Sequence, residues 1–217
     1  MDSIAELIKQ IGEKARSASN SLRIASTAQK NNALICIANQ IQESKQFILD
    51  ANHIDLNAAK KNGIDDALLD RLMLNDERLN SVIQGLHQIA TLNDPIGQIS
   101  NFKERPSGIK IGKMMVPLGV IGMIYESRPN VTVDAAGLCI KSGNAIILRG
   151  GSEAINSNIA FYSCIEKGLE DAGLDPNSVQ LIKVTDREAV THLVSATDHV
   201  DAIIPRGGKG LIKNISK

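Results

Sequence analysis

The second half of this sequence alternates short apolar segments with segments of helical periodicity, and that alternation restricts the fold more than any other feature. We expect strands over residues 116–124, 145–148, 179–184 and 200–204, and helices over residues 131–141, 153–172, 186–195 and 207–215. Short apolar strands that alternate with helices are typical of a parallel sheet covered by helices on both faces. The sequence therefore predicts an α/β fold.

The first half has a different pattern. Apolar residues recur at helical spacing from Ile4, from Leu34 and from Leu79, and Pro95 follows the last of these groups. Between the helices and the sheet, residues 96–116 alternate irregularly around a Pro-Ser-Gly turn, which predicts a β-hairpin or a pair of short strands. We therefore divide the chain into a helical segment (1–95), a hairpin (96–116) and an α/β domain (117–217).

Charge and hydropathy argue against two classes of partner. The chain has 24 basic and 24 acidic residues, whereas a nucleic-acid-binding domain normally has a basic face. The uncharged stretch 114–124 is interrupted by Pro117 and is shorter than the roughly 20 residues that span a bilayer. Acidic residues stand near the amino terminus, where a signal peptide has basic ones. We expect neither nucleic-acid nor membrane binding.

The three cysteines, Cys36, Cys139 and Cys164, are far apart in the sequence and form no CxxC pair. This spacing argues against a disulfide framework and against a zinc site, and we expect no metal. Free cysteines without a framework are typical of a reducing compartment, so we expect a cytoplasmic protein.

Glycine-rich or polar turns follow three of the expected strands, at residues 125–130, 148–153 and 205–210. In an open parallel sheet, ligands bind beyond the carboxyl ends of the strands. Glycines there allow the backbone to approach a phosphate, and the next helix offers free N–H groups. None of these turns is a GxGxxG fingerprint, so structural turns without a ligand remain the alternative.

The runs 116–130, 141–154 and 204–211 closely resemble the matching runs of the γ-glutamyl phosphate reductase family, and so do 67–72 and 94–97. This family, within the aldehyde dehydrogenase superfamily, reduces γ-glutamyl phosphate to glutamate 5-semialdehyde in proline biosynthesis. The resemblance implies an aldehyde-dehydrogenase-like fold, NADP as cofactor and a small-molecule substrate. It also implies a homo-oligomer for the full-length family, with the hairpin as the oligomerisation element.

The resemblance assigns cofactor contacts to two of the turns. Arg149 stands where the superfamily usually has a lysine, and a guanidinium there suits a 2′-phosphate. Glu153 has the alternative of a first-turn helix acid, and Arg206 that of a solvated surface charge. The expected cofactor-binding residues are Arg149, Gly150, Gly151, Ser152, Glu153, Arg206, Gly207 and Gly208.

Two further residues are assigned to catalysis and to substrate. Asn130 resembles the superfamily asparagine that donates a hydrogen bond to the developing oxyanion, and its alternative is a helix cap. Arg128 matches the reductase family rather than the wider superfamily. It could contact the acyl phosphate or carboxylate of the substrate, or form a structural salt bridge.

The nucleophile is the point at which this chain departs from the family. The resemblance places the catalytic cysteine downstream of residues 205–208, so we expect this chain to be an amino-terminal half that is inactive alone. Cys139 and Cys164 lie within predicted helices and are interpreted as inert core residues. Three hypotheses remain: part of a reductase, a non-catalytic NADP-binding fragment, or a helical interaction module whose glycine turns are structural.

Overall fold

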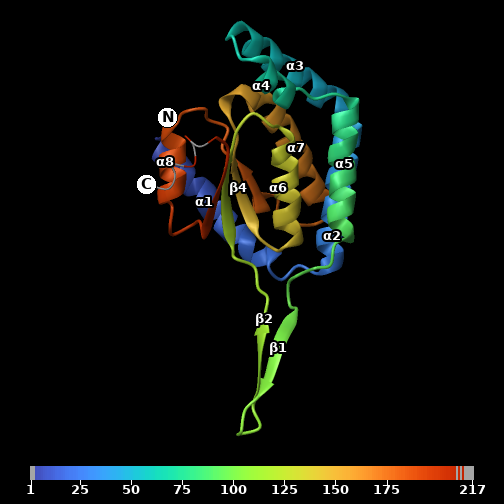
Figure 1. Ribbon diagram of the computed structural model, residues 1–217, viewed down its shortest axis with the longest axis vertical. Helices are drawn as coiled ribbons and strands as arrows, with labels where there is room; N and C mark the ends of the chain where they lie inside the picture. The colour runs from blue at the N-terminus through green and yellow to red at the C-terminus, as the bar shows by residue number, and fades with distance from the viewer. Residues whose placement is uncertain (1–2, 209, 211, 213–217) are drawn as a thin grey trace.

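The computed structural model describes residues 3–208, 210 and 212, and its central element is a parallel sheet with helices on both faces (Figure 1). The helices are α1 (Ile4–Leu22), α2 (Thr27–Glu43), α3 (Lys45–Lys61), α4 (Asp66–Leu72), α5 (Asp76–Thr91), α6 (Asn130–Lys141), α7 (Ile155–Asp171) and α8 (Glu188–Ser195). The strands are β1 (Ile99–Glu104), β2 (Lys110–Met114), β3 (Val120–Tyr125), β4 (Ala145–Arg149), β5 (Val179–Leu181) and β6 (Ala202–Arg206). The predicted α/β fold is confirmed.

The strand order of the sheet determines where a ligand can bind. The order is β5-β4-β3-β6 and every pairing is parallel, with Val120 opposite Ala145 and Ile121 opposite Ala202. The chain moves outward from β3 through β4 to β5, and then crosses to the other side of β3 to form β6. A crevice beyond the carboxyl ends of the strands forms where the order reverses, so β3 and β6 flank the expected ligand position.

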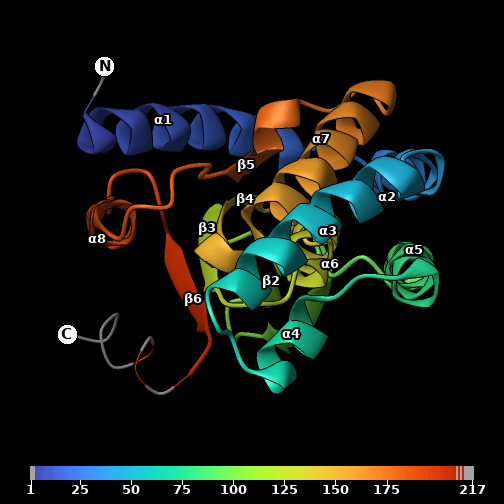
Figure 2. The same cartoon turned by 90° about the horizontal axis from the view of Figure 1, so that it is seen from above.

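Alternate side chains of the strands enter two separate cores. On one face, Ile121 and Ile146 pack with the buried faces of α2, α5, α6 and α7. On the other face, Ile124 and Ile147 pack with residues of α1 and α8. Figure 2 shows this arrangement from above, with α1 and α8 on one side of the sheet and α6 and α7 on the other. Because both faces of β3 and β4 are buried, these central strands are almost entirely apolar, as the sequence pattern requires, whereas the edge strand β6 is half exposed.

Helices α2 and α7 approach each other very closely at one glycine. A Cβ atom on Gly168 would lie 2.7 Å from both the Cα and the backbone N of Ile37. Real Cβ atoms do not come this near to backbone, so any side chain at Gly168 forces the two helices apart. Gly168 therefore fixes the depth at which α2 packs on α7.

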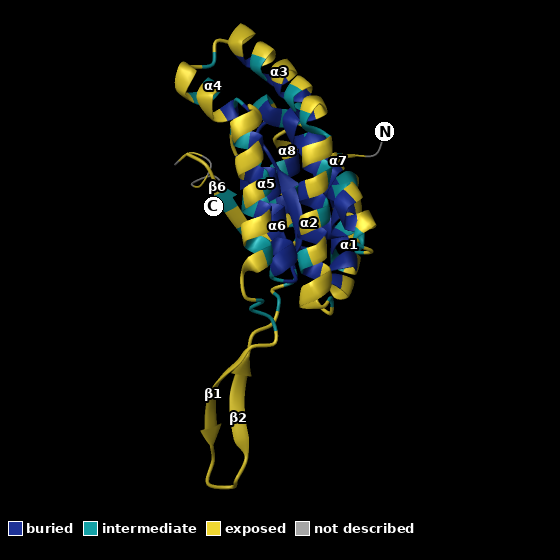
Figure 3. Ribbon diagram, turned by 90° about the vertical axis from the view of Figure 1, so that its right-hand side faces the viewer, coloured by how far each residue is buried: buried dark blue, intermediate teal, exposed yellow. Residues whose placement is uncertain are grey.

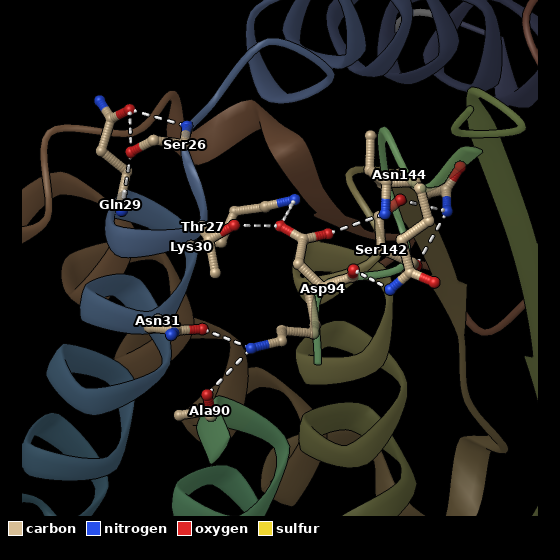
Figure 4. A network of polar contacts seen from close by, with 12 residues as sticks. Ser26, Thr27, Gln29, Lys30, Asn31, Ala90, Asp94, Ser142 and Asn144 are labelled. Atoms are coloured by element: carbon tan, nitrogen blue, oxygen red, sulfur yellow. Dashed lines mark hydrogen bonds and ion pairs between the residues drawn. The ribbon is translucent and has the colours of Figure 1, made fainter. Parts of the chain in front are cut away.

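A buried network joins α2, the end of α5 and the end of α6 (Figure 4). Lys30 Nζ lies 2.6 Å from the carboxylate of Asp94, which also accepts a hydrogen bond of 2.7 Å from Thr27. Lys141 Nζ donates to the Asn31 side chain and to the Ala90 carbonyl, at 2.6 and 2.9 Å. Burial alone would raise the pKa of Asp94, but the hydrogen bonds from Lys30, the Ile96 amide and Thr27 lower it overall. The network holds the chain where it leaves the body for the hairpin.

Polar side chains define where several helices begin. The carboxylate of Asp55, itself buried in α3, accepts from the backbone amides of Asn156 and Ser157 and from the Ser157 hydroxyl. These amides belong to the first turn of α7, where a carboxylate meets both the free N–H groups and the positive end of the helix dipole. Side-chain N-caps begin four other helices: Ser3, Ser26, Asp65 and Asn75.

Strands β1 and β2 form a hairpin that projects away from the body, and every residue of both strands is exposed (Figures 1 and 3). The pairing is antiparallel from Ile99 opposite Met114 to Glu104 opposite Lys110, with an irregularity between Ser100 and Lys103. The hairpin therefore contributes no residue to either core. Elsewhere in the described part of the chain, no helix is both long and apolar enough to cross a membrane.

The main difference from the expected elements lies at the start of the sheet. The predicted strand over 116–124 begins only at Val120, because Gly119 has a φ of +125°. A Cβ at Gly119 would also lie 2.1 Å from the Asp201 carboxylate. The expected helix from 207 to 215 falls largely outside the described residues.

We predict that Gly168→Ala destabilises the fold by about 1–3 kcal/mol, the usual range for overpacking a close contact. The matched control is Gly85→Ala in α5, where an added Cβ meets nothing within 4 Å. Because glycine in a helix interior is unfavourable relative to alanine, the control should gain about 0.5–1 kcal/mol. Urea unfolding of both variants measures this, and equal stabilisation of the two would show that α2 and α7 are not in close contact.

Candidate functional site

The turns that follow β3, β4 and β6 meet at the carboxyl edge of the sheet. In the turn after β3, the Ser127 amide and hydroxyl donate to the Glu153 carboxylate at 2.7 and 2.8 Å. In the same turn, the Glu126 carboxylate accepts from the Gly208 amide at 2.9 Å. The turn after β3 is thus hydrogen-bonded to both of the others, at the crevice that the strand order creates.

A cavity of about 650 Å³ opens between this edge and α8, and we call it the α8 cavity. It includes Ile124, Tyr125 and Glu126 at the end of β3. Its polar wall comes from the turn after β4 and from α8 with its preceding loop. The polar residues most relevant to a ligand are Arg149, Ser152, Glu153, Arg187 and Thr191.

Arg149 lies in the wall of the α8 cavity with most of its donors already in use. The side chain is 8% exposed, and Nη2 donates to the Thr185 carbonyl at 2.9 Å while Nη1 donates to the Gly150 carbonyl. Burial lowers the pKa of Arg149, with the nearby Glu153 carboxylate acting in the other direction. The assignment of Arg149 to a 2′-phosphate stays a prediction, since this guanidinium is bonded to backbone carbonyls.

The two glycines of the turn after β4 differ in role. Gly151 lines the α8 cavity, whereas Gly150 faces the core. A Cβ on Gly150 would lie 2.2 Å from Asn158 Nδ2 and 3.1 Å from the Tyr125 ring. Tyr125, Thr132 and Asn158 form a buried hydrogen-bonded chain at that point. Packing therefore suffices to explain Gly150, without any ligand.

A second cavity, of about 380 Å³, lies on the other side of the turn after β3, and we call it the α4–α5 cavity. It brings together Arg128 from the turn after β3, Asn130 and Asp134 from α6, and residues of α4 and α5. The Asn130 amide donates to the Asp134 carboxylate at 2.9 Å. Burial raises the pKa of Asp134, while the Asn130 hydrogen bond and the Arg206 charge lower it in part.

The helix-cap alternative for Asn130 is wrong. Asn130 is the first residue of α6, Pro129 occupies the cap position, and no side-chain cap hydrogen bond forms. The Asn130 amide therefore faces the α4–α5 cavity with Asp134 as its hydrogen-bond acceptor.

Three arginines line the α4–α5 cavity, and they differ in their partners. Arg78 donates to the Asp70 side chain and to the Met73 carbonyl, both at 2.8 Å, and so ties α5 to α4. Arg71 and Arg128 are exposed, and within the described ranges neither side chain makes a hydrogen bond or ion pair. The salt bridge considered for Arg128 is thus not found there. Sequence reasoning missed Arg71 and Asp134 as site residues, although Arg71 lies in the family-like run 67–72.

None of the three cysteines has the properties of a catalytic thiolate. Burial raises the pKa of Cys139 to about 12. Burial also raises the pKa of Cys164, and burial followed by the Asp171 charge raises that of Cys36. All three thiols are therefore protonated near neutral pH, as core cysteines usually are. Among the described residues, no group of three His, Cys, Asp or Glu side chains could hold a metal ion.

The architecture is that of the aldehyde dehydrogenases. A probable aldehyde dehydrogenase from Listeria monocytogenes superposes with a TM-score of 0.74 over 98% of this chain and 44% of that one, at 17% identity. At such low identity the likeness shows the fold alone. No family model matches the chain.

Closer similarity is found to the γ-glutamyl phosphate reductases. The γ-glutamyl phosphate reductase of Thermotoga maritima superposes with a TM-score of 0.94 and 41% identity, over 96% of this chain and 50% of that one. The enzyme of that name from Ruthia magnifica is 59% identical over 216 residues, covering 100% of this chain and 52% of the relative. The resemblance seen in the sequence is confirmed: the chain matches γ-glutamyl phosphate reductases from end to end. It spans about half the length of these relatives.

We predict that, in the folded chain at mildly alkaline pH, a chromogenic disulfide reagent reacts rapidly with no cysteine other than Cys36. Cys139 and Cys164 are buried and protonated, and the thiolate is the reactive form. In denaturant all three thiols should react at a similar rate. Rapid modification of Cys139 or Cys164 in the folded chain, localised by peptide mass, would instead reveal an activated thiol.

Proposed function

We propose that this chain forms the cofactor-binding part of a γ-glutamyl phosphate reductase. The reaction is the NADPH-dependent reduction of γ-glutamyl phosphate to glutamate 5-semialdehyde in proline biosynthesis, in the cytoplasm. The observation that carries this proposal is the α8 cavity, which opens at the carboxyl edge against the ends of β3 and β4, and β3 is one of the two strands that flank the point where the strand order reverses. That position is where open α/β sheets bind dinucleotides.

Each group of residues at this edge has a definite task in the proposal. Gly151, Ser152 and Glu153 line the α8 cavity and suit the adenosine ribose. Arg206, Gly207 and Gly208 suit the pyrophosphate, because the Gly208 amide already donates to an anionic group, the carboxylate of Glu126. When bound, the cofactor supplies the hydride.

The α4–α5 cavity is the proposed substrate side. Arg128, which has no partner within the described part of the chain, offers its guanidinium to the acyl phosphate or to the carboxylate of the substrate. One N–H of the Asn130 amide donates to Asp134, which orients the group and leaves the other N–H for an oxyanion. A preorganised amide donor of this kind contributes about 3–4 kcal/mol to an oxyanion transition state.

This chain alone should not turn over. The superfamily route needs a thiolate that forms a covalent thioester, and the three thiols present here are protonated. The proposed contribution of the chain is therefore to bind the cofactor and to supply Asn130 and Arg128 to the reaction.

We also propose that the hairpin makes contacts between copies of the protein. Its apolar side chains include Phe102, Ile109 and Ile111, which are 66%, 61% and 46% exposed. An exposed apolar two-stranded element gains stability when another chain covers it.

The cofactor assignment can be tested with a pair of substitutions at one exposed position of α8. Thr191→Trp should fill part of the α8 cavity and weaken NADPH binding by about tenfold or more, a loss of roughly 1.4 kcal/mol. Thr191→Ser keeps the cavity open and should bind NADPH like the unaltered chain. NADPH fluorescence titration measures both. Equal affinity of the two variants would place the nucleotide elsewhere.

The proposed contact through the hairpin can be tested separately. Phe102→Ser combined with Ile111→Ser should shift the chain toward the monomer in sedimentation at micromolar concentration, because it removes apolar surface from the proposed contact. Ile24→Ser is the control, since Ile24 is 82% exposed in the loop between α1 and α2. If both changes leave the sedimentation profile unaltered, the hairpin does not join copies of this chain.

A further inference from the structure

The charged side chains of the α8 cavity differ in their hydrogen-bond partners. The two terminal nitrogens of Arg149 donate to carbonyls of residues 150, 185 and 186. Its Nε has no hydrogen-bond partner in the described part of the chain, but this atom is itself buried. Three of the five N–H groups of Arg149 are thus bonded to backbone carbonyls, and a phosphate that took over these donors would leave the carbonyls without a partner.

The hydrogen bonds of Arg149 instead fix a loop. Thr185 and Asp186 connect β5 to α8, and the guanidinium holds their carbonyls against the end of β4. The next residue in the chain is Arg187, at the amino-terminal boundary of α8, and it lines the same cavity. By holding the two preceding residues, Arg149 sets the position of the Arg187 backbone at the edge of the cavity.

Arg187 is the arginine of this cavity whose guanidinium has no hydrogen-bond or ion-pair partner among the described residues. Its side chain is exposed, and no hydrogen bond or ion pair to it is found within residues 3–208, 210 and 212. The neighbouring acids have other donors: Glu153 accepts from Ser127, Glu126 from the Gly208 amide, and Asp186 from the Glu188 amide. The positive charge of Arg187 also contributes to the lowered pKa of Arg149, after burial, so the two guanidinium groups lie near each other.

We propose that Arg187 binds the phosphate on the 2′ position of the adenosine ribose and so selects NADP over NAD, and that Arg149 acts as its positioning residue. The inference rests on the proposed nucleotide site in the α8 cavity. A guanidinium with free donors can form two parallel charge-assisted hydrogen bonds to a phosphate. A nucleotide without that phosphate leaves Arg187 in solvent, where it was before binding. Arg187 therefore favours NADP by attracting its 2′-phosphate and does not repel NAD.

The experiment compares 2′,5′-ADP with 5′-AMP by calorimetric titration of the whole 217-residue chain. The two nucleotides differ only in the 2′-phosphate. Arg187→Gln should weaken 2′,5′-ADP binding by about tenfold or more, the equivalent of one charge-assisted hydrogen bond, and should leave 5′-AMP binding unchanged. Arg105→Gln, an exposed arginine in the turn of the hairpin, removes the same charge far from the cavity and should alter neither affinity.

The outcomes separate the inference from the function on which it rests. Binding of both nucleotides with a preference that Arg187→Gln does not change would overturn the role of Arg187 and leave the nucleotide site standing. Loss of the preference in Arg149→Lys but not in Arg187→Gln would assign the 2′-phosphate to Arg149. Failure of the unaltered chain to bind either nucleotide would overturn the cavity assignment, and with it this inference.

Discussion

The carboxylate of Asp201 accepts hydrogen bonds from the Arg16 guanidinium and from the Val120 amide, both at 2.7 Å, and so joins the start of β6 to the start of β3 and to α1. The Arg16 hydrogen bond lowers the pKa of Asp201, although burial acts in the opposite direction. The parallel register that begins there ends with Tyr125 opposite Arg206. Both cavities include residues of the turn that follows β3. The geometry of the candidate site thus depends on contacts at the far end of the sheet.

Apolar periodicity was sufficient to find the elements of this fold, because it reflects burial directly. The residues of β4 from Ala145 to Leu148 are at most 1% exposed, and a strand buried on both faces has to be apolar throughout. Boundaries were less predictable where tertiary contacts decide them. The segment 116–119 carries no charge, like the strand that follows, but the positive φ of Gly119 and its approach to Asp201 keep it out of the sheet. No local pattern reports such a contact.

For the candidate site too, the sequence predicted some features and not others. Its place at the carboxyl edge followed from the turns after parallel strands, since those turns share one edge in any such sheet. The direction of individual side chains did not follow. Arg149 looked like a free cation in the sequence, yet its guanidinium meets carbonyls 36 and 37 residues further along the chain. Arg187 and Asp134 had no sequence signal, because a single charged residue at a helix boundary or within a helix resembles an ordinary surface residue.

The close packing of α2 on α7 also affects how the chain reaches its fold during synthesis. Gln40 in α2 donates to Asp171 at the end of α7, across a sequence separation of 131 residues. At ribosomal rates of about 5–20 residues per second, roughly 7–26 s pass between the synthesis of the two positions. During that time the face of α2 around Ile37, which is 1% exposed in the finished fold, has no α7 to cover it. The newly made helical segment thus presents an apolar stripe of the kind that chaperones bind, until the second half of the sheet domain emerges.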